Sequence, residues 1–179
     1  MGENFVLVHG AWHGGWAWQP VASRLRAAGH RVWAPTCPGL GVDDDPRGVT
    51  LAGCVDSLVS QVEASFAVDV TLVGHSWGGY VIAGAAPRLA SRLKRLVFWS
   101  AFVPEAGKPL YDEVPPAYQE LFASSAGASE DVALPPGEYG WSRFAERIKV
   151  SPVPVPGSHE SMFTRPAELA DALTQVATA

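Results

Sequence analysis

The residues with the clearest chemical potential are a serine in the middle of the chain and a histidine far beyond it. Ser76 lies in the stretch LVGHSWGGYVI, where an apolar run typical of a strand gives way to a pattern typical of a helix. His159 lies in VPVPGSHESMF, just after a short apolar segment. A hydroxyl and an imidazole that meet in space can carry out nucleophilic acyl transfer. We therefore take Ser76 as a candidate nucleophile and His159 as its candidate base.

Two glycines flank the serine in the pattern G-x-S-x-G. A sharp turn from strand into helix leaves no room for side chains at Gly74 and Gly78, and it strains the backbone of the serine. The alternative is a glycine-rich turn that contains serine by chance. The position of the pattern between a strand and a helix favours the functional interpretation, because ligands of open α/β sheets bind at the carboxyl ends of the strands.

Acyl transfer also needs backbone N–H groups aimed at the oxyanion that develops on the substrate. The first strand-like run ends in His9-Gly10-Ala11, and the second donor would follow the nucleophile. We expect the N–H groups of Ala11 and Trp77 to form this oxyanion hole. His9 and His13 are interpreted as residues that pack the loop and line the pocket, with a role as ligand or base as the alternative.

Aromatic residues close to these segments predict an apolar pocket for a small molecule. We expect Trp12, Phe102 and Tyr111 to contact the substrate. Since aromatic side chains more often pack in cores or on surfaces, ordinary packing is the alternative.

These residues need a scaffold, and strand-like runs alternate with helix-like runs along the chain. The expected strands are 4–8, 30–34, 69–73, 95–99 and 151–155. The expected helices are 16–28, 51–62, 80–89, 141–148 and 166–176, with a short helical candidate at 118–123. Such alternation is typical of the α/β class, in which helices cover both faces of a parallel sheet. We predict about five parallel strands, with 151–155 paired directly beside 95–99.

Composition narrows the classes of partner. The chain has 179 residues, a formal net charge of −5 and 47% hydrophobic residues. Without a Lys/Arg cluster there is no electrostatic reason to expect nucleic acid or an anionic membrane as a partner. No apolar run approaches the roughly 20 residues of a membrane span. We expect one domain over residues 1–179 and no metal or cofactor. We also expect a cytoplasmic location, since the N-terminus lacks a signal-peptide pattern.

The two cysteines do not predict a disulfide framework. Cys37 lies near a Pro-Gly turn and Cys54 in a helix-like run.

Four blocks of the sequence resemble the α/β-hydrolase superfamily, in particular the branch of plant methylesterases, hydroxynitrile lyases and bacterial esterase relatives. The blocks are FVLVHGAWHGGWAW, VTLVGHSWGGYVI, RLVFWSAFVPEAG and GSHESMFTRPAELADAL, which cover most of 4–104 and 141–177. The resemblance implies an α/β-hydrolase fold and a triad in the order serine, acid, histidine. It implies a serine hydrolase, an esterase or thioesterase, that acts on a small-molecule ester.

The chain departs from this family between Ala101 and Trp141. Family members carry a larger helical cap here, followed by a strand whose end supplies the triad aspartate. Only about forty residues are present in this chain. We therefore expect 104–140 to form a reduced cap or lid, without a clear acid strand. Asp131 is the first candidate for the acid and Glu105 the second; further candidates are Asp112, Glu113 and Glu138.

Two other functions stay open. A lyase or cyclase would use the same pocket without an acyl-enzyme, with Lys108 as the cap-region lysine that hydroxynitrile lyases require. A catalytically weakened homologue would bind a ligand only. A shortened sheet would also expose apolar surface, which a lid or a second copy of the chain would cover.

Overall fold

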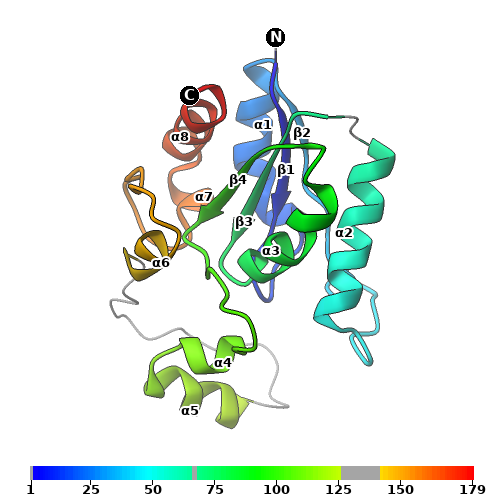
Figure 1. Ribbon diagram of the computed structural model, residues 1–179, viewed down its shortest axis with the longest axis vertical. Helices are drawn as coiled ribbons and strands as arrows, with labels where there is room; N and C mark the ends of the chain where they lie inside the picture. The colour runs from blue at the N-terminus through cyan, green and yellow to red at the C-terminus, as the bar shows by residue number, and fades with distance from the viewer. Residues whose placement is uncertain (1, 66–67, 126–141) are drawn as a thin grey trace.

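A four-stranded parallel sheet forms the centre of the protein. The computed structural model describes residues 2–65, 68–125 and 142–179. The strands are β1 (Asn4–Val8), β2 (Arg31–Trp33), β3 (Val70–His75) and β4 (Leu93–Trp99), in the order β2-β1-β3-β4. Each neighbouring pair is parallel (Figure 1). This arrangement confirms the predicted α/β class.

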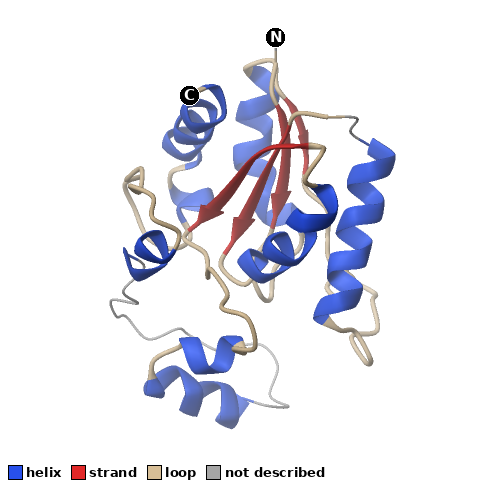
Figure 2. Ribbon diagram, viewed as in Figure 1, coloured by secondary structure: helices blue, strands red, loops and turns tan. Residues whose placement is uncertain are grey.

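Helices cover both faces of the sheet (Figure 2). The helical elements are η1 (Gly15–Trp18), α1 (Gln19–Ala27), α2 (Leu51–Ser65), α3 (Gly78–Leu89), α4 (Leu110–Glu113), α5 (Pro116–Ser125), α6 (Ser142–Arg147), α7 (Ser161–Thr164) and α8 (Pro166–Thr178). The five predicted helices correspond to α1, α2, α3, α6 and α8, and the short candidate at 118–123 lies within α5. None of the described helices has the length and apolar character that a membrane span needs.

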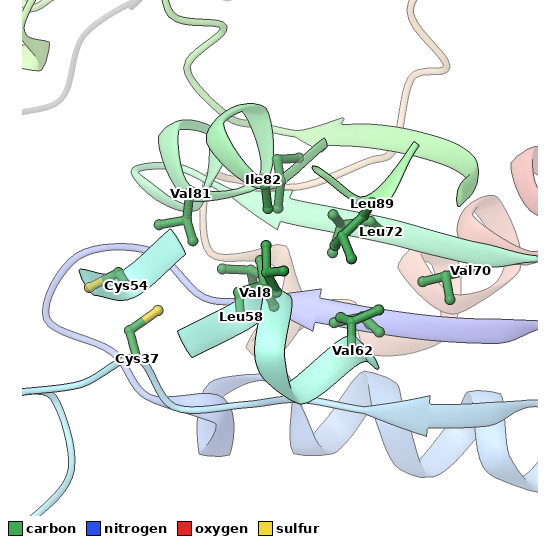
Figure 3. Packing of buried hydrophobic residues seen from close by; sticks show 13 residues of the cluster. Val8, Cys37, Cys54, Leu58, Val62, Val70, Leu72, Val81, Ile82 and Leu89 are labelled. Carbon is green, nitrogen blue, oxygen red and sulfur yellow. The ribbon is translucent and has the colours of Figure 1, made fainter. Parts of the chain in front are cut away.

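The side chains of the strands alternate between two buried clusters. Val6 and Val8 face α2 and α3, where Figure 3 shows Leu58 and Val62 among the side chains that pack there. Phe5 and Leu7 face α1 and α8 on the other side. All four strand residues are fully buried, as expected for a parallel sheet covered on both faces. This packing fixes the carboxyl ends of β1, β3 and β4 at one rim.

Both cysteines are free and buried. Cys37 and Cys54 belong to the cluster under α2 and α3. The sequence-based expectation about disulfides therefore agrees with the structure.

The segment 151–155 does not form the predicted fifth strand. It is an extended loop without ladder hydrogen bonds, so the sheet over the described residues has four strands. Pro152, Pro154 and Pro156 alternate along it, and proline has no N–H to donate. Because alternate residues point to the same edge of a strand, these prolines remove the donors from one edge.

A cavity of about 620 Å³ lies where this strand was expected. Residues of β4, α6, α8 and the loop 150–159 line it.

The described part of 104–140 forms two short helices, α4 and α5, beyond the carboxyl ends of the strands (Figure 1). Val114 and Tyr118 bury their side chains against Phe102 and Phe144. Residues 126–141 lie outside the described residues.

Candidate active site

The turn at Ser76 has the strained geometry that the G-x-S-x-G pattern predicts. β3 ends at His75, α3 begins at Gly78, and Ser76 between them has φ +52°. This left-handed conformation is costly for a residue with a side chain and is found where surrounding structure enforces it. A Cβ on Gly78 would lie 2.6 Å from the His9 carbonyl oxygen, and one on Gly74 would lie 2.8 Å from the Gly78 carbonyl oxygen. Only glycine fits at either position.

The loop after β1 packs against this turn. A Cβ on Gly10 would lie 3.0 Å from Cβ of Ser76, so the chain just before Ala11 contacts the nucleophile. Trp77 is the N-cap of α3, where N–H groups have no acceptor within the helix and the helix dipole is positive. Both segments predicted for the oxyanion hole therefore lie at the serine; the roles of the two N–H groups stay a prediction.

His159 reaches the same place from the loop before α7. Its carbonyl oxygen accepts a hydrogen bond from Nε2 of His75 at 3.1 Å, and the two imidazole rings lie 4.5 Å apart between centroids. His75, which directly precedes Ser76, is fully buried. One residue thus holds His159 beside the candidate nucleophile.

A second contact holds the ring of His159. Its Nδ1 lies 2.7 Å from Oγ of Ser100, which directly follows β4. Both residues also line the cavity beside β4. Ser100 was not among the residues identified from sequence. The sequence feature that could have identified Ser100 is its position as a polar residue immediately after the carboxyl end of a strand.

Burial makes the imidazoles of this site weak bases. Burial, with a smaller contribution from the nearby His13, lowers the pKa of His159 to about 4. Burial also lowers the pKa of His75 well below its usual range, and that of His13. At neutral pH these rings are therefore neutral, and each keeps one nitrogen lone pair.

Glu160 adds a carboxyl group to this cluster. Burial raises the pKa of Glu160, whose Oε2 lies 4.0 Å from Nε2 of His13. His13, His75 and Glu160 each offer one ligand atom within 4.8 Å of the others. Ligand atoms of a tetrahedral zinc ion with bonds of about 2.1 Å lie about 3.4 Å apart, whereas Nε2 of His13 and Oε2 of Glu160 lie 4.0 Å apart.

Two further histidines have structural roles. Nε2 of His9 accepts a hydrogen bond from the Cys37 N–H at 3.0 Å, so Nδ1 carries the proton and donates to the Gly10 carbonyl at 2.8 Å. Nδ1 of His30 accepts from the Glu3 N–H at 3.0 Å. The interpretation of His9 as a packing residue agrees with these contacts.

The three residues predicted to contact substrate have different environments. Trp12 is 61% exposed in the loop after β1. Phe102 is buried, and its N–H donates to the Ser76 carbonyl oxygen at 3.2 Å. Tyr111 is 45% exposed on α4, and its hydroxyl donates to the Gln119 carbonyl oxygen at 3.4 Å. Phe102 thus supports the nucleophile turn directly; a substrate contact for any of the three stays a prediction.

Two of the candidate acids form ion pairs with Arg147. Oε1 of Glu105 lies 3.0 Å from Arg147, and its Oε2 lies 2.7 Å from Nζ of Lys108. Glu113 is buried and lies 3.1 Å from Arg147. These contacts favour structural roles for Glu105 and Glu113.

The remaining candidate acids divide into two groups. Asp112 is exposed on α4. Asp131 and Glu138 lie outside the described residues, so the role of Asp131 stays a prediction.

Comparison with known proteins agrees with this geometry. A family model described as "Alpha/beta hydrolase family" matches residues 5–174. The chain belongs to this family. It is 46% identical over 134 residues to a carbendazim hydrolyzing esterase of Nocardioides sp. (strain SG-4G), an alignment that covers 73% of this chain and 55% of that protein. Methylesterase 2 of Arabidopsis thaliana is 36% identical over 127 residues, covering 69% of this chain and 46% of the relative.

A solved structure of this hydrolase family also matches. An extracellular alpha/beta-hydrolase from Paenibacillus species is 34% identical with a TM-score of 0.67, covering 74% of this chain and 55% of that chain. The present chain spans about half the length of these relatives.

Proposed function

We propose that the protein is a serine hydrolase that cleaves a small carboxylic ester or thioester. The observation that carries the proposal is the position of His159, which His75 holds beside the strained turn of Ser76. The similarity to proteins named as esterases supports it. The aromatic residues near the turn favour an apolar substrate, and no cofactor is required for this chemistry.

The reaction follows from the roles of these groups. Oγ of Ser76 attacks the carbonyl carbon of the ester while Nε2 of His159 takes the hydroxyl proton. The N–H groups of Ala11 and Trp77 stabilise the oxyanion of the tetrahedral intermediate. His159 then passes its proton to the departing alcohol or thiol. In the second half of the reaction, His159 takes a proton from a water molecule that attacks the acyl-enzyme, and it returns this proton to Oγ of Ser76 as the carboxylic acid leaves.

The experiment combines covalent labelling with turnover. The wild-type protein is treated with a fluorophosphonate probe, and hydrolysis of p-nitrophenyl acetate is measured in parallel. We expect an adduct on Ser76, and a loss of turnover of about 10³-fold or more in Ser76→Ala and in His159→Ala. Ser60→Ala, an exposed serine on α2, is the matched control and should retain full activity.

Other outcomes would point to the alternatives. Labelling of Ser76 without ester turnover would favour a lyase or cyclase. For that chemistry the candidate Lys108 would first have to leave its ion pair with Glu105. No labelling, no turnover and a ligand that still raises Tm would indicate a binding protein and end the proposal.

A further inference from the structure

We propose that Ser100 is the positioning residue that orients the imidazole of His159, with a neutral hydroxyl in the place where a serine–histidine pair ordinarily has a carboxylate. This inference rests on the proposed hydrolase function. Its basis is the contact of 2.7 Å between Oγ of Ser100 and Nδ1 of His159. In a triad, the nitrogen that faces away from the nucleophile makes this type of contact with the acid.

The sheet register places the two serines side by side. His75 on β3 pairs with Trp99 on β4, so Ser76 and Ser100 are the next residues of two neighbouring parallel strands. They therefore lie at the same rim of the sheet. From this position Ser100 reaches Nδ1 of His159.

The backbone of Ser100 is held in a fixed geometry. Ser100 has φ +44°, a left-handed conformation like that of Ser76. Two residues later, the Phe102 N–H donates to the Ser76 carbonyl oxygen at 3.2 Å. The chain after β4 is thus tied to the nucleophile turn. A strained backbone enforced by such contacts is common at functional sites, where it fixes the direction of a side chain.

The hydrogen bond determines which nitrogen of His159 is the base. If Nδ1–H donates to Oγ of Ser100, the lone pair stays on Nε2, which can take the proton of Ser76. If the hydroxyl donates instead, Nε2 carries the proton and cannot act as a base. The catalytic role therefore requires Ser100 as the acceptor.

A hydroxyl orients the ring but adds no negative charge to stabilise the imidazolium that forms during the reaction. Within residues 2–65, 68–125 and 142–179, the ionisable groups that face His159 are His75 at the end of β3, His13 in the loop after β1, and the neighbouring Glu160. Two of them are neutral imidazoles. We therefore expect slow turnover that an added carboxylate would accelerate.

The test compares Ser100→Ala with Ser100→Asp. Aspartate tolerates a positive φ better than most residues, and the cavity beside Ser100 leaves room for the longer side chain. We expect Ser100→Ala to lower kcat for p-nitrophenyl acetate about 10-fold with little change in KM. We expect Ser100→Asp to raise kcat about 10-fold and to move the acidic limb of the pH profile upward by about 1–2 units, because a carboxylate favours the charged imidazole.

A spectroscopic readout does not depend on turnover. The ¹⁵N shifts of the His159 ring at neutral pH should show the proton on Nδ1 in the wild type and a shift toward the other tautomer in Ser100→Ala. Ser151→Ala and Ser151→Asp are the matched controls, because Ser151 is exposed and lines the same cavity. Both should leave kcat, the pH profile and the tautomer unchanged, and Tm checks that each variant is folded.

Several results would overturn the proposal. Ser100→Ala with wild-type kcat and pH profile would do so, as would a wild-type His159 protonated on Nε2. Loss of activity in Asp131→Asn with full activity in Ser100→Ala would assign the orienting role to Asp131. A wild type with the Nδ1–H tautomer but neither labelling nor turnover would reject the hydrolase function while supporting the contact itself.

Discussion

At the scale of single residues, the environment of His159 sets the pH range of the chemistry. Burial lowers its pKa to about 4, and a general base must be deprotonated to act. Activity should therefore stay constant as the pH falls from 7 toward 5 and should be lost only near pH 4. The measurement is kcat/KM against pH, with a rapid return to pH 7 as the control for irreversible unfolding. An acidic limb near 6.5 would contradict the burial of this ring.

At the scale of elements, the close approach of α3 to β1 depends on a single glycine. In Gly78→Ala the new Cβ would meet the His9 carbonyl oxygen at 2.6 Å, and this backbone atom cannot move aside cheaply. We expect the free energy of unfolding, measured by urea denaturation, to fall by about 3 kcal/mol. Gly53→Ala in α2 is the control, since its Cβ would meet only Oγ1 of Thr50 at 3.4 Å. It should be neutral or stabilising by up to about 1 kcal/mol.

The attachment of α4 depends on a buried carboxylate. Glu113 is 5% exposed and lies 3.1 Å from Arg147 on α6 and 3.6 Å from Arg143. Glu113→Gln should lower the free energy of unfolding by about 2 kcal/mol, because the ion pairs of the buried carboxylate with Arg147 and Arg143 are lost. Limited proteolysis should also cut faster near α4.

The control for this variant is an exposed pair. Asp56→Asn removes a partner of Arg88 at the surface and should cost less than about 1 kcal/mol. Equal effects of Glu113→Gln and Asp56→Asn would show that the buried contact does not hold α4.

At the scale of the whole molecule, the buried histidines make stability depend on pH. Burial lowers the pKa of His9, His13, His75 and His159, so the unfolded chain binds more protons than the folded chain below pH 6.5. Stability is then fully present above pH 6.5 and decreases as the pH falls toward 4. His159 alone would contribute about 3 kcal/mol to this decrease. The raised pKa of Glu160 acts in the opposite direction.

Urea denaturation at pH 7 and pH 4.5 measures this dependence. His159→Gln should flatten it, because the glutamine does not titrate. A stability that is equal at both pH values would show that these rings are not held neutral by the fold.

The oligomeric state stays a prediction. Leu96, Ile148, Val150 and Val153 are partly exposed around the cavity beside β4. Sedimentation velocity would show whether a second copy of the chain associates, and a monomer at all concentrations would reject the predicted homodimer.

Local sequence patterns determined most of the secondary structure and the geometry of the turn at Ser76. The alternation of strands and helices, the glycines around Ser76 and the structural role of His9 could be predicted, because period, turn chemistry and glycine spacing act over a few residues. The error at 151–155 has a local cause as well, since its alternating prolines remove backbone donors from one edge.

The tertiary structure alone decided what contacts His159. Ser100 has no local pattern that marks it, and its partner lies 59 residues further along the chain. Their meeting depends on the β3–β4 register, on the left-handed turn at Ser100 and on the loop that His75 holds. Such a contact depends on the packing of segments far apart in the chain, and for this physical reason no local pattern could place Ser100 beside His159.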